Sequence, residues 1–192
     1  VISEPEAAAY VNQYHGLLDT LAPTVNSWPE HILTDCDHQG PLPRLNLSVK
    51  LSALVSHFRP IDPVGTSLAV KERLRPLLRK ARDQHAYLHV DMEQHSYKDL
   101  TLAIFKEILE EDEFRDFADV GIVIQTYLHE ADRDLAELLE WVKRRGTPIW
   151  IRLVKGAYRE PKAVAYQRKA DVDAQFALLT QRLLERGTYP AI

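Results

Sequence analysis

The stretch VGIVIQTYLHEADRDLAELLEWVKRRGTPIWIRLV, residues 120–154, decides the fold. It begins with a nearly unbroken apolar run at 120–127, which is typical of a strand buried on both faces. Apolar residues at helical spacing over 132–145 then predict an amphipathic helix, which Gly146 ends. A second β-rich run follows at 148–154. Such a strand–helix–strand unit joins two parallel strands through a crossover helix.

The same alternation extends on both sides of this stretch. Four prolines predict an irregular connection over 23–43, and Pro76 is expected to kink or interrupt a helix. Four strands alternating with helices fit an open doubly wound parallel sheet or half of a (β/α)8 barrel. The further predicted elements are strands at 44–50 and 86–91 and helices at 4–22, 67–81, 98–109 and 169–187.

Composition excludes several classes of protein. The 192 residues are 45% hydrophobic and 27% charged, which is enough for one domain. The net charge of −4 disfavours a dedicated nucleic-acid binder. The single cysteine, Cys36, excludes an internal disulfide framework, and no apolar run reaches the about 18 residues of a membrane helix. The N-terminus shows no signal pattern. The chain lacks a starting Met and its last residues, YPAI, stop without a terminal cap, so we expect it to come from something longer.

Each predicted strand finishes with a polar group, and parallel strands bind ligands at these ends. The groups are Lys50, Asp91, Gln125 and Arg152, and Lys155 follows directly after the last strand. Fixed positive charges at 152 and 155 match an anionic ligand group or a ring that gains charge. An amide at 125 offers both a donor and an acceptor. The sequence has neither a GxGxxG after its first strand nor a phosphate loop.

No metal site is predicted. His85 and His89 fall in a strand, where a spacing of four residues separates them by about 13 Å. His31, Cys36 and His38 lie in the proline-rich connection without a recognisable set of zinc ligands.

Five blocks of sequence together resemble one family, the proline dehydrogenase domain. That domain is a flavoenzyme found alone or at the front of bifunctional proline utilization A proteins. The resemblance covers about residues 1–190 and implies one domain over 1–192, a distorted (β/α)8 barrel that is incomplete in this chain. It also implies FAD-dependent oxidation of L-proline to Δ1-pyrroline-5-carboxylate, with electrons passed to a quinone. The blocks are LSVKLSAL (47–54), HVDMEQ (89–94), GIVIQTYL (121–128), IRLVKGAY (151–158) and KADVDAQF (169–176).

The resemblance assigns roles by position. It implies that Asp91 and Arg152 are catalytic, with the guanidinium near flavin N5, where it stabilises the reduced ring. Lys50 and Tyr158 are implied to bind the substrate. The residues implied to bind FAD are Leu88, Gln125, Arg152, Lys155, Gly156 and Ala157.

Two departures from the family bear on activity. Arg159 stands where the family usually has Trp. The family also has a late helix that grips the proline carboxylate and a later FAD-binding strand, and the sequence ends at Ile192 before that region. We therefore expect that this chain alone does not turn over proline. The residues leave two alternatives open: a different (β/α)8 enzyme, such as a Schiff-base lyase using Lys50 or Lys155, and a cofactor-free, non-catalytic fragment.

The resemblance also implies partners and a location. The family contains both monofunctional proteins and proteins with a linked aldehyde dehydrogenase domain, and the resemblance leaves both open for the parent protein. It leaves open peripheral contact with a membrane that holds the quinone, and we expect no nucleic acid partner. The expected location is the bacterial cytoplasm, or the mitochondrion for a eukaryotic source.

Overall fold

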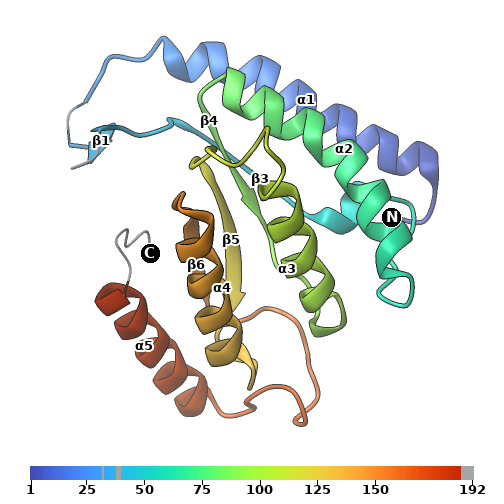
Figure 1. The fold of residues 1–192 in the computed structure, drawn as a ribbon, viewed down its shortest axis with the longest axis vertical. Helices are drawn as coiled ribbons and strands as arrows, with labels where there is room; N and C mark the ends of the chain where they lie inside the picture. Colours follow the sequence, from blue (N-terminus) through green and yellow to red (C-terminus); the bar gives the residue numbers. More distant parts are fainter. Residues whose placement is uncertain (32, 38–39, 187–192) are drawn as a thin grey trace. The chain divides into compact units, whose positions relative to one another are not determined.

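The computed structural model describes residues 1–31, 33–37 and 40–186, and its contacts group into two compact units, Val1–His89 and Val90–Ile192. From Leu45 onward strands and helices alternate, as the sequence predicts (Figure 1). No helix within the described ranges is long and apolar enough to cross a membrane.

In the first unit, helices α1 and α2 lie side by side (Figure 1). Lys80 of α2 forms a 2.5 Å ion pair with Asp19 of α1, and Arg73 pairs with Glu4. Strand β3 neighbours β4 in one sheet. The elements are α1 (Glu4–Asn26), β1 (Cys36–Asp37), β2 (Gly40–Pro41), β3 (Leu45–Val49), the 3-10 turn η1 (Leu51–Ala53), α2 (Pro63–Asp83) and β4 (Ala86–Val90).

The structure corrects the predicted boundary at residue 22. Helix α1 continues to Asn26 and includes Pro23. A proline in the last turn removes one backbone donor near the helix end, and burial of Ala22 and Val25 favours the added turn. The connection over 23–43 is also less irregular than predicted, since β1 and β2 pair antiparallel within it.

Helix α2 is not interrupted at its proline either. It runs unbroken through Pro76, whose flanking residues Leu74, Leu77 and Leu78 are buried. Packing of this apolar face therefore outweighs the backbone hydrogen bond that the proline removes.

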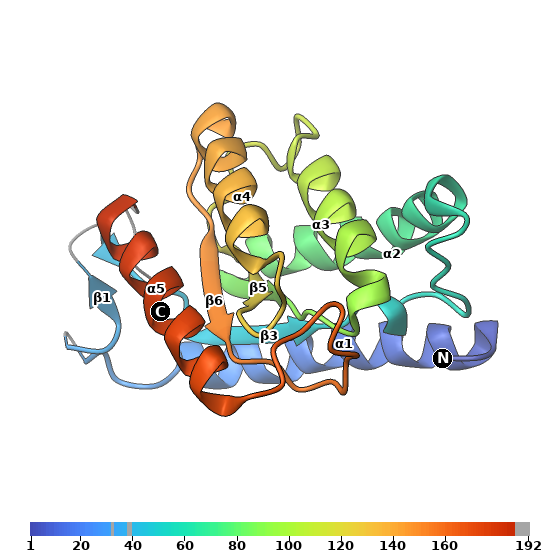
Figure 2. The ribbon, with the colours of Figure 1, turned by 90° about the horizontal axis from the view of Figure 1, so that it is seen from below.

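In the second unit, β5 and β6 pair in parallel from Gly121↔Trp150 to Gln125↔Val154. Helix α4 packs on β5 and α5 packs on β6, and α3 and α4 stand on the same side of these strands (Figure 2). The elements are α3 (His95–Leu109), β5 (Val120–Gln125), α4 (Ala131–Arg145), β6 (Trp150–Val154) and α5 (Lys169–Arg186).

The central stretch folds as its pattern predicts. All six residues of β5 are buried, which confirms a strand covered on both faces. Gly146 ends α4 in the left-handed conformation, with a φ of 79°. The strands are shorter than predicted, ending at Gln125 and beginning at Trp150. Gly187, the predicted stop of α5, lies outside the described residues.

Candidate functional site

The carboxyl ends of β5 and β6 lie level with each other. Beyond the last strand pair, Thr126 N donates to Val154 O at 2.7 Å and Tyr127 N donates to Lys155 O at 2.8 Å. The residues that follow both strands are therefore neighbours. Ligands of parallel α/β proteins bind at this edge, so we build the candidate site from it.

Asp91 and Arg152, predicted separately as polar strand-end groups, form an ion pair. Arg152 Nη2 donates to Asp91 Oδ1 at 2.5 Å. The Arg152 side chain is 45% exposed and that of Asp91 is 20% exposed. A guanidinium carries five N–H donors in a fixed plane. The carboxylate can thus orient the guanidinium while its accessible part donates to a ligand.

Gln125 supplies a buried amide at the end of β5. Its side chain is 3% exposed, and Nε2 donates to Met92 O at 3.5 Å. Oε1 is buried and accepts no hydrogen bond within the described part of the chain. A buried acceptor left without a donor costs free energy, which an N–H group of a ligand would offset. This acceptor fits the edge of a flavin ring, which carries such a group.

Lys155 and Gly156 continue from β6. Lys155 Nζ donates to Asp173 Oδ1 of α5 at 2.6 Å and lies 5.7 Å from the centroid of the Phe176 ring. Gly156 has a φ of 128°, and a Cβ built there would lie 2.2 Å from Tyr127 Cδ1. Only glycine fits this contact. The predicted FAD-binding roles of Lys155, Gly156 and the exposed Ala157 stay predictions.

Tyr158 is 37% exposed and lies beside the start of α3. It lines a cavity of about 260 Å³, whose other lining residues are Gln94, His95, Ser96, Arg159, Glu160, Pro161 and Val164. A hydroxyl and an aromatic face at a cavity fit a substrate-binding role, and this assignment also stays a prediction.

Two predicted residues belong to the first unit. Lys50 is exposed, follows β3, and its backbone N–H donates to the Tyr14 hydroxyl at 3.5 Å. Leu88 lies in β4 and is fully buried. The roles predicted for both residues stay predictions.

The sequence analysis missed Tyr127. Its side chain is only 8% exposed, and its ring packs against Gly156. Burial raises the pKa of this phenol to about 12, and the nearby charge of Glu160 adds to the rise. Its position two residues after Gln125, at a strand end, was the signal available in the sequence.

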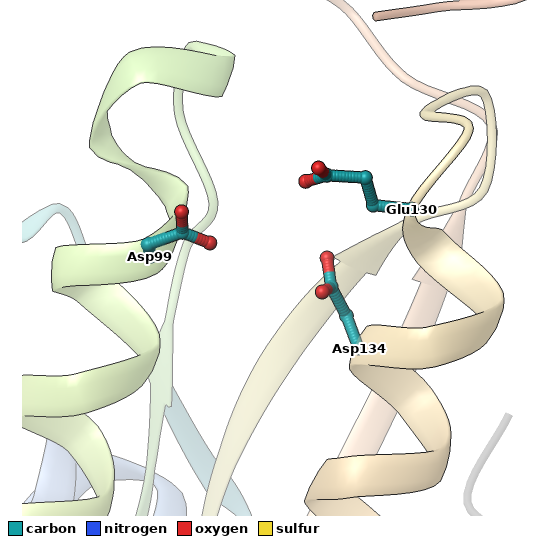
Figure 3. Close-up of side chains that lie close together, drawn as sticks. All are labelled: Asp99, Glu130 and Asp134. Carbon is teal, nitrogen blue, oxygen red and sulfur yellow. The ribbon is translucent and has the colours of Figure 1, made fainter.

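A cluster of acidic side chains joins α3 to the start of α4 (Figure 3). Carboxylate oxygens of Asp99, Glu130 and Asp134 lie within 4.8 Å of one another. Two cations face these carboxylates. Lys98 Nζ lies 2.6 Å from Asp99 Oδ1, 3.2 Å from Glu130 Oε2 and 2.7 Å from Asp134 Oδ2. Arg133 Nη2 lies 3.3 Å from Glu130 Oε2 and 3.2 Å from Asp134 Oδ1. We interpret this group as a structural ion-pair network.

The ionisation of the network follows from these contacts. Burial by itself would lower the pKa of Lys98, but hydrogen bonds to Asp134 and Asp99 raise it above its usual value. The same ammonium lowers the pKa values of Asp99 and Glu130.

Comparison with known proteins confirms the resemblance. A family model described as proline dehydrogenase matches residues 1–191. Proline dehydrogenase 1 of Bacillus subtilis is 35% identical over 119 residues, which are 62% of this chain and 36% of that protein. Proline dehydrogenase of Deinococcus radiodurans is 34% identical over 143 residues, 74% of this chain and 42% of that protein. The chain thus spans less than half the length of these curated relatives.

A solved structure gives the same result for the fold. Proline utilization A from Bdellovibrio bacteriovorus is 39% identical, with a TM-score of 0.92 over 96% of this chain and 20% of that one. The likeness confirms the predicted α/β class of the (β/α)8 barrel type. Since the family model covers all but one residue, the chain belongs to the proline dehydrogenase family.

Proposed function

We propose that the protein containing this chain oxidises L-proline to Δ1-pyrroline-5-carboxylate, with FAD as cofactor and a quinone as electron acceptor. Membership of the proline dehydrogenase family, whose members are flavoenzymes acting on proline, supports the reaction. The single structural observation that carries the proposal is the Arg152 guanidinium, held by Asp91 and accessible at the end of β6.

Each site residue then has a physical task. When bound, FAD supplies the acceptor for the electron pair that leaves proline as its C–N bond becomes C=N. Arg152 would lie against the ring and stabilise the negative charge that develops there, while Asp91 keeps the guanidinium oriented. Gln125 would accept a hydrogen bond from the ring edge through Oε1. Both tasks require side chains that are held in one place. Asp91 and Gln125 meet this requirement because both are largely buried.

The remaining predicted residues complete the proposal. Lys50 and Tyr158 would bind the proline, and Leu88, Lys155, Gly156 and Ala157 would line the cofactor site. We extend the proposal to a linked aldehyde dehydrogenase domain in the parent protein, because the solved relative is a proline utilization A protein. The bacterial cytoplasm, with peripheral contact to a quinone-bearing membrane, is the location we propose.

The test is a visible absorption spectrum of the full-length protein reconstituted with FAD, recorded before and after addition of L-proline. We expect a flavin band that bleaches with L-proline. Loss of one charge-stabilising donor in Arg152→Met should slow bleaching about 100-fold. Arg144→Met, which removes an exposed arginine of α4, is the control and should bleach at the wild-type rate. A protein that binds no flavin, or bleaching that Arg152→Met leaves unchanged, would contradict the proposal.

A Schiff base on Lys155 is less well supported by the geometry. An imine forms on a free amine, whereas Lys155 Nζ donates to Asp173 at 2.6 Å. Borohydride reduction in the presence of a carbonyl substrate would trap an adduct on a lysine if this alternative were correct. The third alternative is a cofactor-free fragment. Recording the same spectrum on the 192-residue chain by itself tests it, because a cofactor-free fragment would show no flavin band.

A further inference from the structure

We propose that Glu160 is a positioning residue, which fastens the segment after β6 to the first turn of α3 and thereby fixes the place of Tyr158. The inference rests on the proposed function, in which Tyr158 binds proline. We call residues 155–168 the β6–α5 segment. Tyr158 lies within it, between two points of attachment.

The first point of attachment is Gly156. Its φ of 128° is a conformation that residues with a side chain rarely adopt, and the ring of Tyr127 occupies the space where a Cβ would lie. One residue earlier, Lys155 O accepts a 2.8 Å hydrogen bond from Tyr127 N. These two contacts therefore fix the path of the backbone as it leaves β6.

The second point of attachment is the Glu160 carboxylate. Glu160 Oε1 accepts a 2.7 Å hydrogen bond from the backbone N–H of His95, the first residue of α3. The first N–H groups of a helix have no partner within the helix, and the N-terminus favours a negative charge. Gln94, the residue at the N-cap position, makes no side-chain capping bond. Glu160 thus supplies from 65 residues away the cap that the local sequence lacks.

The rest of the segment is held without the Glu160 side chain. Tyr166 N donates to Tyr127 O at 2.9 Å, and His129 N donates to Val164 O at 2.9 Å. The Gln167 amide donates to the carbonyl of Ala165 at 2.9 Å. The same amide donates to the backbone carbonyl of Glu160 at 3.2 Å. Removing the carboxylate should therefore loosen the short stretch 157–160, which carries Tyr158, without detaching its end at residue 160. The effect is expected to be local to that stretch.

The experiment uses the full-length protein with Glu160→Ala and Glu160→Gln. The control is Glu137→Ala, which removes an acid of α4 whose side chain is 62% exposed. Trypsin cleavage after Arg159 and Lys162 is followed by mass spectrometry. Each rate is divided by the rate for a free peptide of the same sequence, because residue 160 adjoins the Arg159 cleavage site and changes its intrinsic rate. L-proline oxidation is measured at steady state. Glu160→Ala should raise the cleavage rate about fivefold, as expected for loss of one helix cap. The KM for L-proline should rise by a similar factor of about five while kcat changes less than about twofold. Glu160→Gln keeps the acceptor and should recover part of both losses.

Three results would overturn the proposal. The first is unchanged cleavage in Glu160→Ala. The second is faster cleavage with an unchanged KM, which would separate the attachment from Tyr158. The third is an equal rise of KM in the Glu137→Ala control. If the wild-type protein does not oxidise L-proline at all, the proposed function fails, and the cleavage rates still decide whether Glu160 holds the segment.

Discussion

Replacing Lys98 by Met should destabilise the chain more than any exposed substitution. The Lys98 side chain is 3% exposed and that of its partner Asp134 is 5% exposed, so both charges are out of water. Lys98→Met keeps the length of the side chain and removes the ammonium. Asp134 would then be a buried carboxylate beside two others, Asp99 and Glu130, with oxygens within 4.8 Å.

The magnitude follows from which charges are buried. Breaking a buried ion pair by removing one partner costs about 3–5 kcal/mol when the remaining charge is left uncompensated. Arg133 stays 3.2 Å from Asp134, but its side chain is 56% exposed, and an exposed partner offsets only about 1 kcal/mol or less. We therefore expect a cost toward the lower end of that range. Asp99 is 82% exposed and adds little to this cost. For a chain of 192 residues, each kcal/mol lowers Tm by about 2–4 °C. Lys98→Met should therefore lower Tm by about 6–20 °C.

The assay is unfolding by heat and by urea, each followed by circular dichroism, with Lys143→Met, an exposed lysine of α4, as the matched control. The double variant Lys98→Met/Asp134→Leu removes both buried charges and should recover most of the loss, since apolar side chains can replace a buried pair at little cost. A loss below about 1 kcal/mol in Lys98→Met would refute the reasoning, since exposed pairs contribute that little. A double variant no more stable than Lys98→Met would refute it as well.

Three further predictions follow from named contacts. Arg145→Lys should lower the free energy of unfolding by about 2–4 kcal/mol in urea titrations, because the guanidinium donates to the carbonyls of Phe114 and Phe117 at 2.8 Å and lysine cannot reach both. Gly156→Ala should lower flavin retention in the reconstituted protein, measured by absorbance, because the added Cβ collides with a ring and requires a strained φ. Because the pKa values of Asp99 and Glu130 are lowered, their stabilisation is fully present above about pH 4.5 and is lost as pH falls through their folded-state pKa values. The acid limb of a stability-against-pH curve should therefore flatten in Lys98→Met, and an unchanged limb would contradict this.

Local patterns predicted the elements well and their ends less well. Strand β5 and the end of α4 each depend on a short local pattern, an apolar run and a glycine. Periodicity and capping chemistry are therefore enough to predict them. Pro23 led to a wrong helix boundary, and Pro76 does not interrupt its helix, because burial of neighbouring side chains outweighed a rule about single residues. Both outcomes have the same cause, since a helix in a protein draws most of its stability from packing. The predicted kink at Pro76 stays a prediction.

The sequence by itself determined the order of strands and helices, the polar residue at each strand end and the family. The tertiary structure alone decided which polar residues meet. Arg152 pairs with Asp91 across 61 residues of chain, and Glu160 caps α3 across 65. The local sequence around each of these residues does not indicate its partner. Such contacts depend on how the strands align and on where the loops between them return to the sheet. The order of the elements follows from patterns along the chain, whereas their ends and the site depend on neighbours in space.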